Sequence, residues 1–402
     1  MSASLKVEFV SVSTVMGKAQ RILTLTTIHY PSTIDMKAID IKGGTGPREA
    51  LFLNPDVPTP VPAEGQALVK IRAFGINRMD IIQRHGKYAL PPQAPKTLGV
   101  EFSGVIDSFG PGAEADHGFA VGDEVFGLAY GGAYAEYLSV STRMLVKKPA
   151  SMSWEVAASI PESLTLPFPP RHHLYGELNP AEEYNKPRLT RKKQAWITAL
   201  QALTVVGEFS RGKSVLWHAG ASGVSLAGIQ LSRLLGASEI YATAGSDEKC
   251  AYLTRDLGVT AAFNYRTTPD WSGEILARTG GRGVDVVVDF VGKDYLQKNI
   301  DVAARDGRVV LLGLLSGPVV EAGLNISGLL YKRLRIEGST LRSRDVEYQG
   351  RLRDELERYV PEFETGKLRA IVDTVLPWEE IQKAHQLMEE NKNKGKIVCT
   401  IS

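Results

Sequence analysis

The sequence predicts an α/β protein in which a β-rich, barrel-like domain precedes a doubly wound parallel sheet. Many short β segments, punctuated by Gly and Pro, fill residues 36–148. From residue 214 onward, strand-like and helix-like segments alternate, which is typical of a parallel sheet with helices on both faces. A strand, a glycine turn and a helix open this second part at 214–236.

In the first part, a strand is expected at 36–41, and residues 67–76 alternate in polarity as a half-buried strand does. Residues 151–162 predict a helix with Ser153 as its cap. Further strands are expected at 99–107, 123–129 and 133–140.

The second part predicts a regular succession of strands and helices. Asp306 and Gly307 predict a turn before its last strand. A final strand at 395–401 is expected to return to the first domain. The strands of the second part are expected at 214–219, 239–244, 261–265, 284–290 and 308–312, and the helices at 224–235, 247–257, 271–279, 295–304 and 378–391.

We divide the chain into an N-terminal extension and four further parts, whose bounds follow from these patterns. They are the extension 1–35, a catalytic domain 36–162, an atypical insertion 163–194, a nucleotide domain 195–340 and a return to the catalytic domain 341–402.

Composition indicates an ordinary globular chain. Its 402 residues are 43% hydrophobic and carry 47 Lys and Arg against 45 Asp and Glu, which gives no nucleic-acid signal by itself. The two cysteines, Cys250 and Cys399, exclude a disulfide framework and a zinc site built from several cysteines. No apolar run approaches the length of a membrane-spanning helix. We therefore expect a cytoplasmic protein that does not contact membranes.

Two segments depart from this regular picture. Residues 1–35 are rich in Ser and Thr with few basic residues, so they are either a weak mitochondrial presequence or an extension before a start at Met36. The Pro-rich, basic segment 163–194 has no helical or strand period, and it is either a loop or a retained intron. Its adjacent His172 and His173 point in different directions and lack a third ligand, so no metal site is predicted.

The glycine turn predicts a phosphate site. Gly220 and Gly223 permit a tight turn and close backbone approach, and the helix that follows exposes N–H groups at its N-terminus. In dinucleotide-binding domains these groups hold a pyrophosphate, here next to Ser222, Gly223 and Val224. By itself the turn is equally compatible with an ordinary strand–helix connection. Gly236 predicts the end of the helix.

Several phrases, in order, resemble the medium-chain dehydrogenase/reductase superfamily, over residues 36–162 and 195–402. The resemblance is closest to its NADPH-dependent quinone oxidoreductase branch and, within that, to the p53-inducible quinone oxidoreductase-like group. It implies a GroES-like catalytic domain, a Rossmann NADP-binding domain and a homodimer. The phrases are Gly75-Ile-Asn77-Arg-Met-Asp80, Leu98-Gly-Val-Glu101-Phe-Ser-Gly-Val, Gly122-Asp-Glu-Val-Phe-Gly, His218-Ala-Gly-Ala-Ser-Gly-Val, Phe263-Asn-Tyr265 and Gly338-Ser-Thr-Leu-Arg-Ser-Arg.

The zinc ligands of the alcohol dehydrogenases in this superfamily are missing. Those enzymes place a Gly-His-Glu where this chain has Gly99-Val100-Glu101, and a cysteine near the position of Asn77. Valine cannot ligate zinc, so the Lewis acid that activates an alcohol is absent. Reduction of an acceptor that is already electrophilic, such as a quinone or an activated enone, does not need one.

The tip of the second strand predicts NADPH as the cofactor. NAD enzymes carry an acid there, about 20 residues past the glycines, to hold the ribose 2′-hydroxyl. Here the tip is Thr243-Ala-Gly-Ser246, in which Gly245 and Ser246 leave room for a phosphate that Lys249 neutralises. Asp247 and Glu248 follow the tip and are expected to cap the helix. By resemblance, Tyr265 lies at the adenosine phosphate end; alternatively it is a core tyrosine.

The resemblance also implies residues around the nicotinamide. Asn77 and Thr198 can hydrogen-bond the carboxamide or the ribose, although Asn77 and Asp80 can equally form a structural turn. Tyr88 is the candidate for contact with the acceptor oxygen, or else packs in the wall. Ser225 stands where the family usually has a third glycine, which can weaken cofactor binding. The implied set is Asn77, Asp80, Ile82, Thr198, Gly292, Leu312, Gly313, Leu341 and Arg342.

The sequence therefore favours a zinc-free reductase that transfers a hydride from NADPH to a quinone or enone acceptor. No obligatory general acid stands out, because water can protonate the product oxygen. The alternative is a catalytically impaired relative that acts as a binding or regulatory protein, with the basic insertion as an RNA-binding or other interaction arm. For the homodimer, 309–314 and 324–330 are the segments expected to pair across a two-fold axis.

Overall fold

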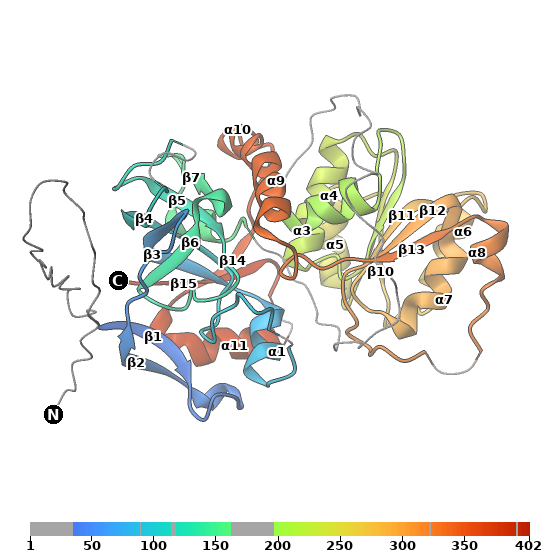
Figure 1. Cartoon of the computed structure of the whole chain (residues 1–402). Coiled ribbons are helices and arrows are strands. Elements are labelled where there is room, and N and C mark those ends of the chain that lie inside the picture. The colour runs from blue at the N-terminus through green and yellow to red at the C-terminus, as the bar shows by residue number, and fades with distance from the viewer. Residues whose placement is uncertain (1–34, 89, 114–117, 162–196, 321–322, 391–392) are drawn as a thin grey trace, which may run out of the picture.

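Two large sheets dominate the fold in the computed structural model, which describes residues 35–88, 90–113, 118–161, 197–320, 323–390 and 393–402 (Figure 1). A seven-stranded sheet has the order β14-β15-β3-β4-β5-β7, with β6 paired to β3, and a six-stranded sheet has the order β10-β9-β8-β11-β12-β13. Strands β1 and β2 form a separate two-stranded ribbon. The α/β fold with a GroES-like and a Rossmann-like part is thereby confirmed. Residues 1–34 and 163–194 lie outside the described residues, so the presequence, start-site and insertion hypotheses stay predictions, as do the domain bounds.

Strand β3 is the centre of the barrel-like part. It pairs with β4, β6 and β15, and its side chains at Val69, Ile71 and Phe74 are completely or almost completely buried. The elements of this part are β1 (Asp35–Ile41), β2 (Leu51–Pro58), β3 (Gln66–Ile76), α1 (Arg78–Arg84), β4 (Glu101–Phe109), β5 (Glu124–Leu128), β6 (Tyr137–Ser141), β7 (Leu145–Lys147) and α2 (Trp154–Ala158).

Helix α2 is shorter than the predicted 151–162. Ser153 is its N-cap as expected, because the Ser153 side chain accepts a hydrogen bond from the N–H of Val156. The helix ends at Ser159, and Pro161 explains the early end, since the residue before a proline disfavours helical backbone.

All strands of the six-stranded sheet are parallel, and its central strands are buried on both faces. This burial explains why they read as continuous apolar runs. The elements are α3 (Ile197–Leu200), a π-helical turn (Gln201–Val206), β8 (Val215–Trp217), α4 (Gly223–Leu234), β9 (Ile240–Ala244), α5 (Asp247–Arg255), β10 (Ala261–Asn264), α6 (Trp271–Arg278), β11 (Val284–Asp289), α7 (Lys293–Val302), β12 (Ala303–Leu311), α8 (Ser327–Tyr331) and β13 (Arg335–Gly338).

The turn predicted at Asp306 and Gly307 is instead an irregularity within β12. Asp306 has a left-handed φ of 61° there, and its carboxylate accepts a 2.7 Å hydrogen bond from Arg333 Nε. The strand register shifts at this point and then continues to Leu311. Residues 304–307 of β12 lie opposite the single residue Asp285 of β11, so the chain makes a tight local loop here and then resumes the strand.

The chain returns to the barrel at its C-terminus, as predicted. Strand β15 pairs antiparallel with β3, joining Ile397 to Ile76 and Thr400 to Ala73. Figure 1 shows the red C-terminal elements among the blue and green strands, with helix α11 beside helix α1. The returning elements are α9 (Val346–Glu357), α10 (Val360–Glu364), β14 (Val372–Pro377), α11 (Ile381–Glu389) and β15 (Lys396–Thr400). Among the described residues, no helix is both long and apolar enough to cross a membrane.

Helix α4 packs against its own strand at Gly228. A Cβ on Gly228 would lie 2.2 Å from the ring of Trp217, which is completely buried in β8. We therefore expect Gly228→Ala to lower the free energy of unfolding by about 1–3 kcal/mol. Gly350→Ala in α9 is the matched control, since a Cβ there meets only the flexible end of Arg143. Urea unfolding measures both, and equal stabilities would contradict the expectation.

Candidate functional site

A cavity of about 720 Å³ lies where the carboxyl ends of β8, β9 and β11 face the barrel part. The glycine turn and the tip of β9 line one side, and residues that follow β3 and precede β15 line the other. Ligands in open parallel sheets bind at this edge. The residues singled out from the sequence that line the cavity are Asn77, Ser222, Gly223, Val224, Gly245, Ser246, Lys249 and Tyr265.

The glycine turn leads directly into helix α4. Ser222 is the N-cap, and its side chain accepts from the N–H of Ser225. Gly220 lies close to the neighbouring strand, because a Cβ there would lie 2.8 Å from Leu253 and 3.0 Å from Ala242. The turn therefore requires glycine at 220, and it presents the start of a helix to the cavity.

Ser225 is accommodated within this turn. Its side chain is fully buried, and its hydroxyl donates a 2.7 Å hydrogen bond to the carbonyl oxygen of His218, at the end of the preceding strand. In the usual motif, the third glycine lets the helix pack closely on the strand. Here Gly228, further along α4, makes such a close contact with Trp217 of β8. Weaker cofactor binding caused by Ser225 stays a prediction.

Cationic side chains gather at the tip of β9. Ser246 caps α5 by accepting from the N–H of Lys249, which lines the cavity together with Arg266. The pKa of Lys249 lies below its usual value, first because the side chain is partly buried and then because of the positive charge of Lys394; Arg266 contributes in the same sense. A positively charged corner of this kind suits a phosphate.

The two acids after the tip do not cap the helix as predicted. The cap is Ser246, whereas Asp247 accepts a 2.7 Å hydrogen bond from Asn264 Nδ2. Glu248 pairs with Lys394. Tyr265 is not a core residue, since it is 39% exposed and its hydroxyl lies where a Cβ on Gly245 would approach within 2.7 Å. Glycine at 245 therefore leaves space for this ring at the cavity.

Other residues implied by the resemblance do not line the cavity, and their contact with a cofactor stays a prediction. Gly292 has a φ of 87° and caps α7, and Arg342 is buried between the carbonyl oxygen of Tyr130 and Gln83 Oε1. The guanidinium of Arg342 also lies 5.0 Å from the ring centre of the half-buried Tyr88. The remaining members are Asp80, Thr198, Leu312, Gly313 and Leu341, which are buried, and Ile82, which is half-buried.

Several cavity residues carry no separate signal in the sequence. Arg266 follows Tyr265 directly and could have been found from that proximity. Phe290 and Leu315 add apolar surface near the ends of β11 and β12. Lys396 lines the cavity from β15, but it is far from the other site residues in the sequence, and only the fold brings it there.

Asp80 holds the start of helix α1 and, through it, the backbone of Asn77. It accepts hydrogen bonds from the N–H groups of Asn77, at 2.8 Å, and Gly99, at 3.2 Å. The Tyr134 hydroxyl donates to it at 3.1 Å. Burial raises the pKa of Asp80 to about 6, although these hydrogen bonds oppose the shift. Asp80 is thus a structural acceptor beneath the cavity.

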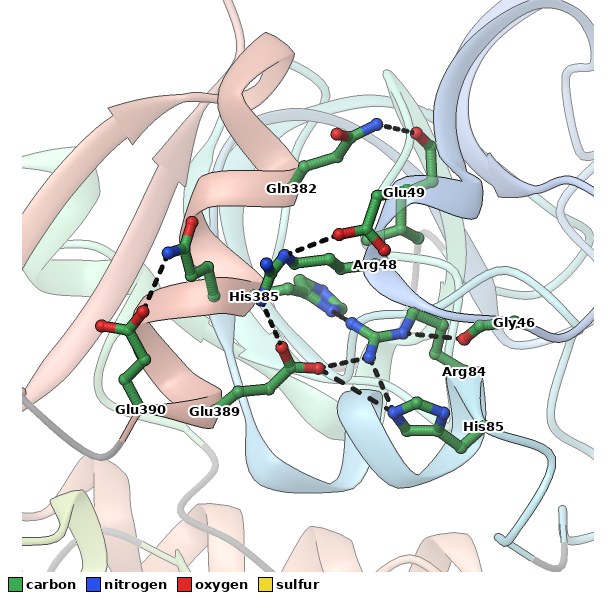
Figure 2. Close-up of polar contacts among 11 residues, drawn as sticks. Gly46, Arg48, Glu49, Arg84, His85, Gln382, His385, Glu389 and Glu390 are labelled. Carbon is green, nitrogen blue, oxygen red and sulfur yellow. Dashed lines mark hydrogen bonds and ion pairs between the residues drawn. The ribbon is translucent and has the colours of Figure 1, made fainter.

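A chain of hydrogen bonds runs from the buried Arg84 to Asp80. Figure 2 shows Arg84 in contact with Glu389, His85, Gly46 and His385. Because a guanidinium only donates, Arg84 donates to Nδ1 of His385, which leaves Nε2 of His385 to donate to Tyr134 at 3.3 Å. Burial, aided by the charge of Arg84, lowers the pKa of His385 to about 3. Every bond in the chain therefore points toward Asp80.

A second buried chain connects the ends of three parallel strands. His218 lies 2.9 Å from Thr243 Oγ1 and 2.7 Å from Asn299 Oδ1, and Asn299 donates to Asp289 at 3.0 Å. Asp289 accepts from the N–H groups of Val291 and Gly292, so the chain fixes the loop after β11. Burial lowers the pKa of His218 to about 4 and raises that of Asp289 to about 7.

Val100, at the position where the zinc-dependent relatives are expected to have histidine, is a core residue. Val100 is only 1% exposed, and Cys250 and Cys399 are buried elsewhere. Within the described ranges, no three His, Cys, Asp or Glu side chains gather as a group that could hold a metal ion. Since valine has no donor atom, this position cannot ligate a metal.

Comparison with known proteins agrees with this architecture. Residues 223–358 match the zinc-binding dehydrogenase family, and residues 63–150 match the alcohol dehydrogenase GroES-like domain. A quinone oxidoreductase from Lama guanicoe is 28% identical over 91% of this chain and 98% of that protein. Prostaglandin reductase-3 from Mus musculus is 30% identical over 88% and 86%. A mycobacterial structure complexed with NADPH is 28% identical, with a TM-score of 0.70 over 91% of this chain and 100% of that chain.

The fold, the cavity and these relatives define the class: the chain belongs to the medium-chain dehydrogenase/reductase superfamily. Within the superfamily it falls in the quinone oxidoreductase-like branch. The closer resemblance to the p53-inducible quinone oxidoreductase-like group stays a prediction.

The buried imidazole of His385 predicts a pH dependence of stability. Its pKa is about 3 in the folded protein against an ordinary 6.5, so below pH 6.5 the unfolded chain takes up a proton that the folded chain refuses. Stability is therefore lost as the pH falls. Between about pH 7 and pH 5, we expect the wild type to lose about 2 kcal/mol more than His385→Gln. Urea unfolding at both values measures this, and parallel losses would contradict it.

Proposed function

We propose that this protein reduces quinones or activated enones by direct hydride transfer from NADPH, without zinc. The observation that carries the proposal is the single cavity that joins the glycine turn, the cationic tip of β9 and Asn77. A nicotinamide cofactor supplies the hydride. The relatives named as quinone oxidoreductases and as prostaglandin reductase-3 support this class of acceptor.

The residues present fit the adenosine and phosphate parts of NADPH. The N-terminus of α4, next to Ser222 and Gly223, would hold the pyrophosphate through backbone N–H groups. At the tip of β9, Ser246 would hydrogen-bond the 2′-phosphate, and Lys249 and Arg266 would neutralise it. Of the two acids that follow the tip, Asp247 bonds to Asn264, and Glu248, which also lines the cavity, is paired with Lys394.

The opposite end of the cavity suits a nicotinamide and an apolar acceptor. Asn77 would bind the carboxamide or the ribose, and Ile76, Phe290 and Leu315 would exclude water from the reacting atoms. Catalysis then rests on placement, because a quinone needs no Lewis acid and water can protonate the product oxygen. Tyr88 is a candidate wall residue near the acceptor, since the Arg342 guanidinium packs against its ring.

A regulatory or RNA-binding role is the alternative. It rests on Ser225 and on the basic segment 163–194. Ser225 is accommodated by its hydrogen bond to His218, which favours a working nucleotide turn, whereas 163–194 lies outside the described residues. We keep the cytoplasm as the proposed location, on the composition alone.

Purified protein mixed with NADPH and a panel of ortho- and para-quinones should consume NADPH, followed by its absorbance. Lys249→Glu should weaken NADPH binding by about 100-fold relative to NADH, because the phosphate then faces a negative charge. Lys367→Glu, at a 61% exposed lysine paired with Glu362, is the control and should bind NADPH as the wild type does. Absence of NADPH binding by the wild type would overturn the proposal, and equal loss of both cofactors would overturn the phosphate assignment.

We also propose a homodimer that uses 324–330, one of the two expected segments, together with strand β13 in place of 309–314. Residues 309–311 cannot pair across a two-fold axis as a strand, because they belong to the inner strand β12, where Val309 and Val310 are fully buried. Strand β13 is one of the two edge strands, with β10 at the other edge, and among the described residues it pairs with β12 alone. Exposed apolar residues in or next to α8 accompany that edge: Ile326 is 59%, Leu330 74% and Tyr331 72% exposed. Pairing of β13 with β13 of a second copy would cover both the open edge of the sheet and these exposed apolar side chains.

Leu330→Asp should therefore shift a dimer toward monomer, because a carboxylate would be buried in an apolar contact. Val121→Asp is the control, as Val121 is similarly exposed at 62% but belongs to the barrel part. Size-exclusion chromatography with light scattering measures the mass of each. A dimer unchanged by Leu330→Asp would contradict this interface.

A further inference from the structure

The side-chain amide of Asn77 is bonded on both of its ends. Its Nδ2 donates to Glu101 Oε1 at 2.9 Å, and Lys396 Nζ donates to its Oδ1 at 2.8 Å. Lys396 also donates to the same Glu101 oxygen at 2.5 Å. All three residues are buried, with Glu101 at 0% and Lys396 at 6% exposure, so little water competes for these bonds.

The three residues come from three separate strands. Asn77 follows β3, Glu101 begins β4 and Lys396 begins β15, which the chain places beside β3 only at its very end. Gly75 makes room for the arrangement, because a Cβ on it would lie 2.1 Å from Glu101 Oε1. In the phrase Gly75-Ile-Asn77, the glycine thus leaves space for the Glu101 carboxylate and the asparagine donates a hydrogen bond to it.

The arrangement permits one orientation of the amide. An ammonium group only donates, so it selects the amide oxygen, and a carboxylate only accepts, so it selects the amide nitrogen. If the amide turned over, its Nδ2 donor would face the Lys396 donor and its Oδ1 acceptor would face the Glu101 acceptor, and both hydrogen bonds would be lost. Asn77 and Lys396 both line the cavity, so the amide is held in one orientation at the cavity wall.

We propose that Glu101 and Lys396 are positioning residues that hold the Asn77 amide in the orientation in which it binds the nicotinamide half of NADPH. This inference rests on the proposed function, in that NADPH occupies the cavity. The pair adds no net charge, so it orients the amide without changing the charge of the cavity. Asp80 fixes the backbone of the same residue, and Asn77 is therefore held at both its main chain and its side chain.

Binding measurements without turnover test the proposal. Isothermal titration compares NADPH with 2′-phosphoadenosine 5′-diphosphate, which has the diphosphate but lacks the nicotinamide and its ribose. We expect Lys396→Met to weaken NADPH binding about tenfold and to leave the fragment unchanged. In a double-mutant cycle, Asn77→Ala should cost less in the Lys396→Met background than alone, since the amide there has already lost one of the two partners that hold it in place.

Two further variants guard against loss of folding. Glu101→Gln with Lys396→Met removes both charges together, so no unpaired buried charge remains, and it should bind NADPH as weakly as Lys396→Met. Lys332→Met is the matched control: Lys332 donates to the carbonyl oxygens of Ile300, Asp301 and Ala303 on the six-stranded sheet. It should bind both ligands as the wild type does. Melting temperatures of all variants report folding.

Each outcome decides the matter. Wild-type affinity of Lys396→Met for NADPH, or additive effects in the cycle, would overturn the inference and leave the proposed function standing. Equal loss of the fragment and of NADPH would also overturn it, because Lys396 would then hold the diphosphate directly. If the wild type binds the fragment but not NADPH, or neither, the proposed function fails and the inference fails with it.

Discussion

The antiparallel pairing of β15 with β3 is the constraint on which the candidate site depends. It carries the C-terminus back across the molecule and places Lys396 beside Asn77, two residues that are 319 positions apart in the sequence. It also places Lys394 near Glu248 and Lys249, at the tip of β9. Without this pairing, the barrel part would contribute the residues after β3 to the cavity but not Gly395 and Lys396. The long-range pairing thus makes the last strand part of the site, although its sequence carries no recognisable motif.

Burial of polar groups in oriented chains is the second organising principle. One chain runs from Arg84 to Asp80 beneath Asn77, and another runs from Thr243 to Asp289 beneath the nucleotide edge. In each, a group that can only donate or only accept sets the direction of every bond between. The low dielectric of the interior strengthens such bonds when all are made and penalises any that are missing. Both chains end on backbone N–H groups of loops at or near the cavity, so the polar core supports the loops that carry function.

Sequence reasoning found the parts of the site that are encoded locally. The turn at Gly220–Gly223 and the tip at Gly245–Lys249 were predicted because each is read within a few residues of one strand end, and the cavity indeed unites them. The return of the last strand was also predicted. Pairings over long distances were not predicted. Nothing in the sequence links Lys396 to Glu101, and nothing shows that 309–311 belongs to an inner strand whereas β13 is at the edge. The capping role assigned to Asp247 and Glu248 was wrong because Ser246, the residue directly before the helix, is the cap, and the two acids already belong to the first helical turn. Periodicity and spacing report local structure, and they do not report which residues become neighbours in the tertiary fold.

The hydrogen bond from Ser225 to His218 has a consequence for the energy of nucleotide binding. It connects the first turn of α4 to the end of β8, so the backbone N–H groups between them are set in place before any phosphate arrives. A turn with three glycines must lose backbone freedom when it closes on its ligand. A turn held by a buried hydroxyl has already lost that freedom during folding, so a smaller loss of entropy on binding would offset part of the weaker cofactor binding predicted for Ser225. The serine at this position therefore moves part of the cost of ordering the turn from the binding step to the folding step.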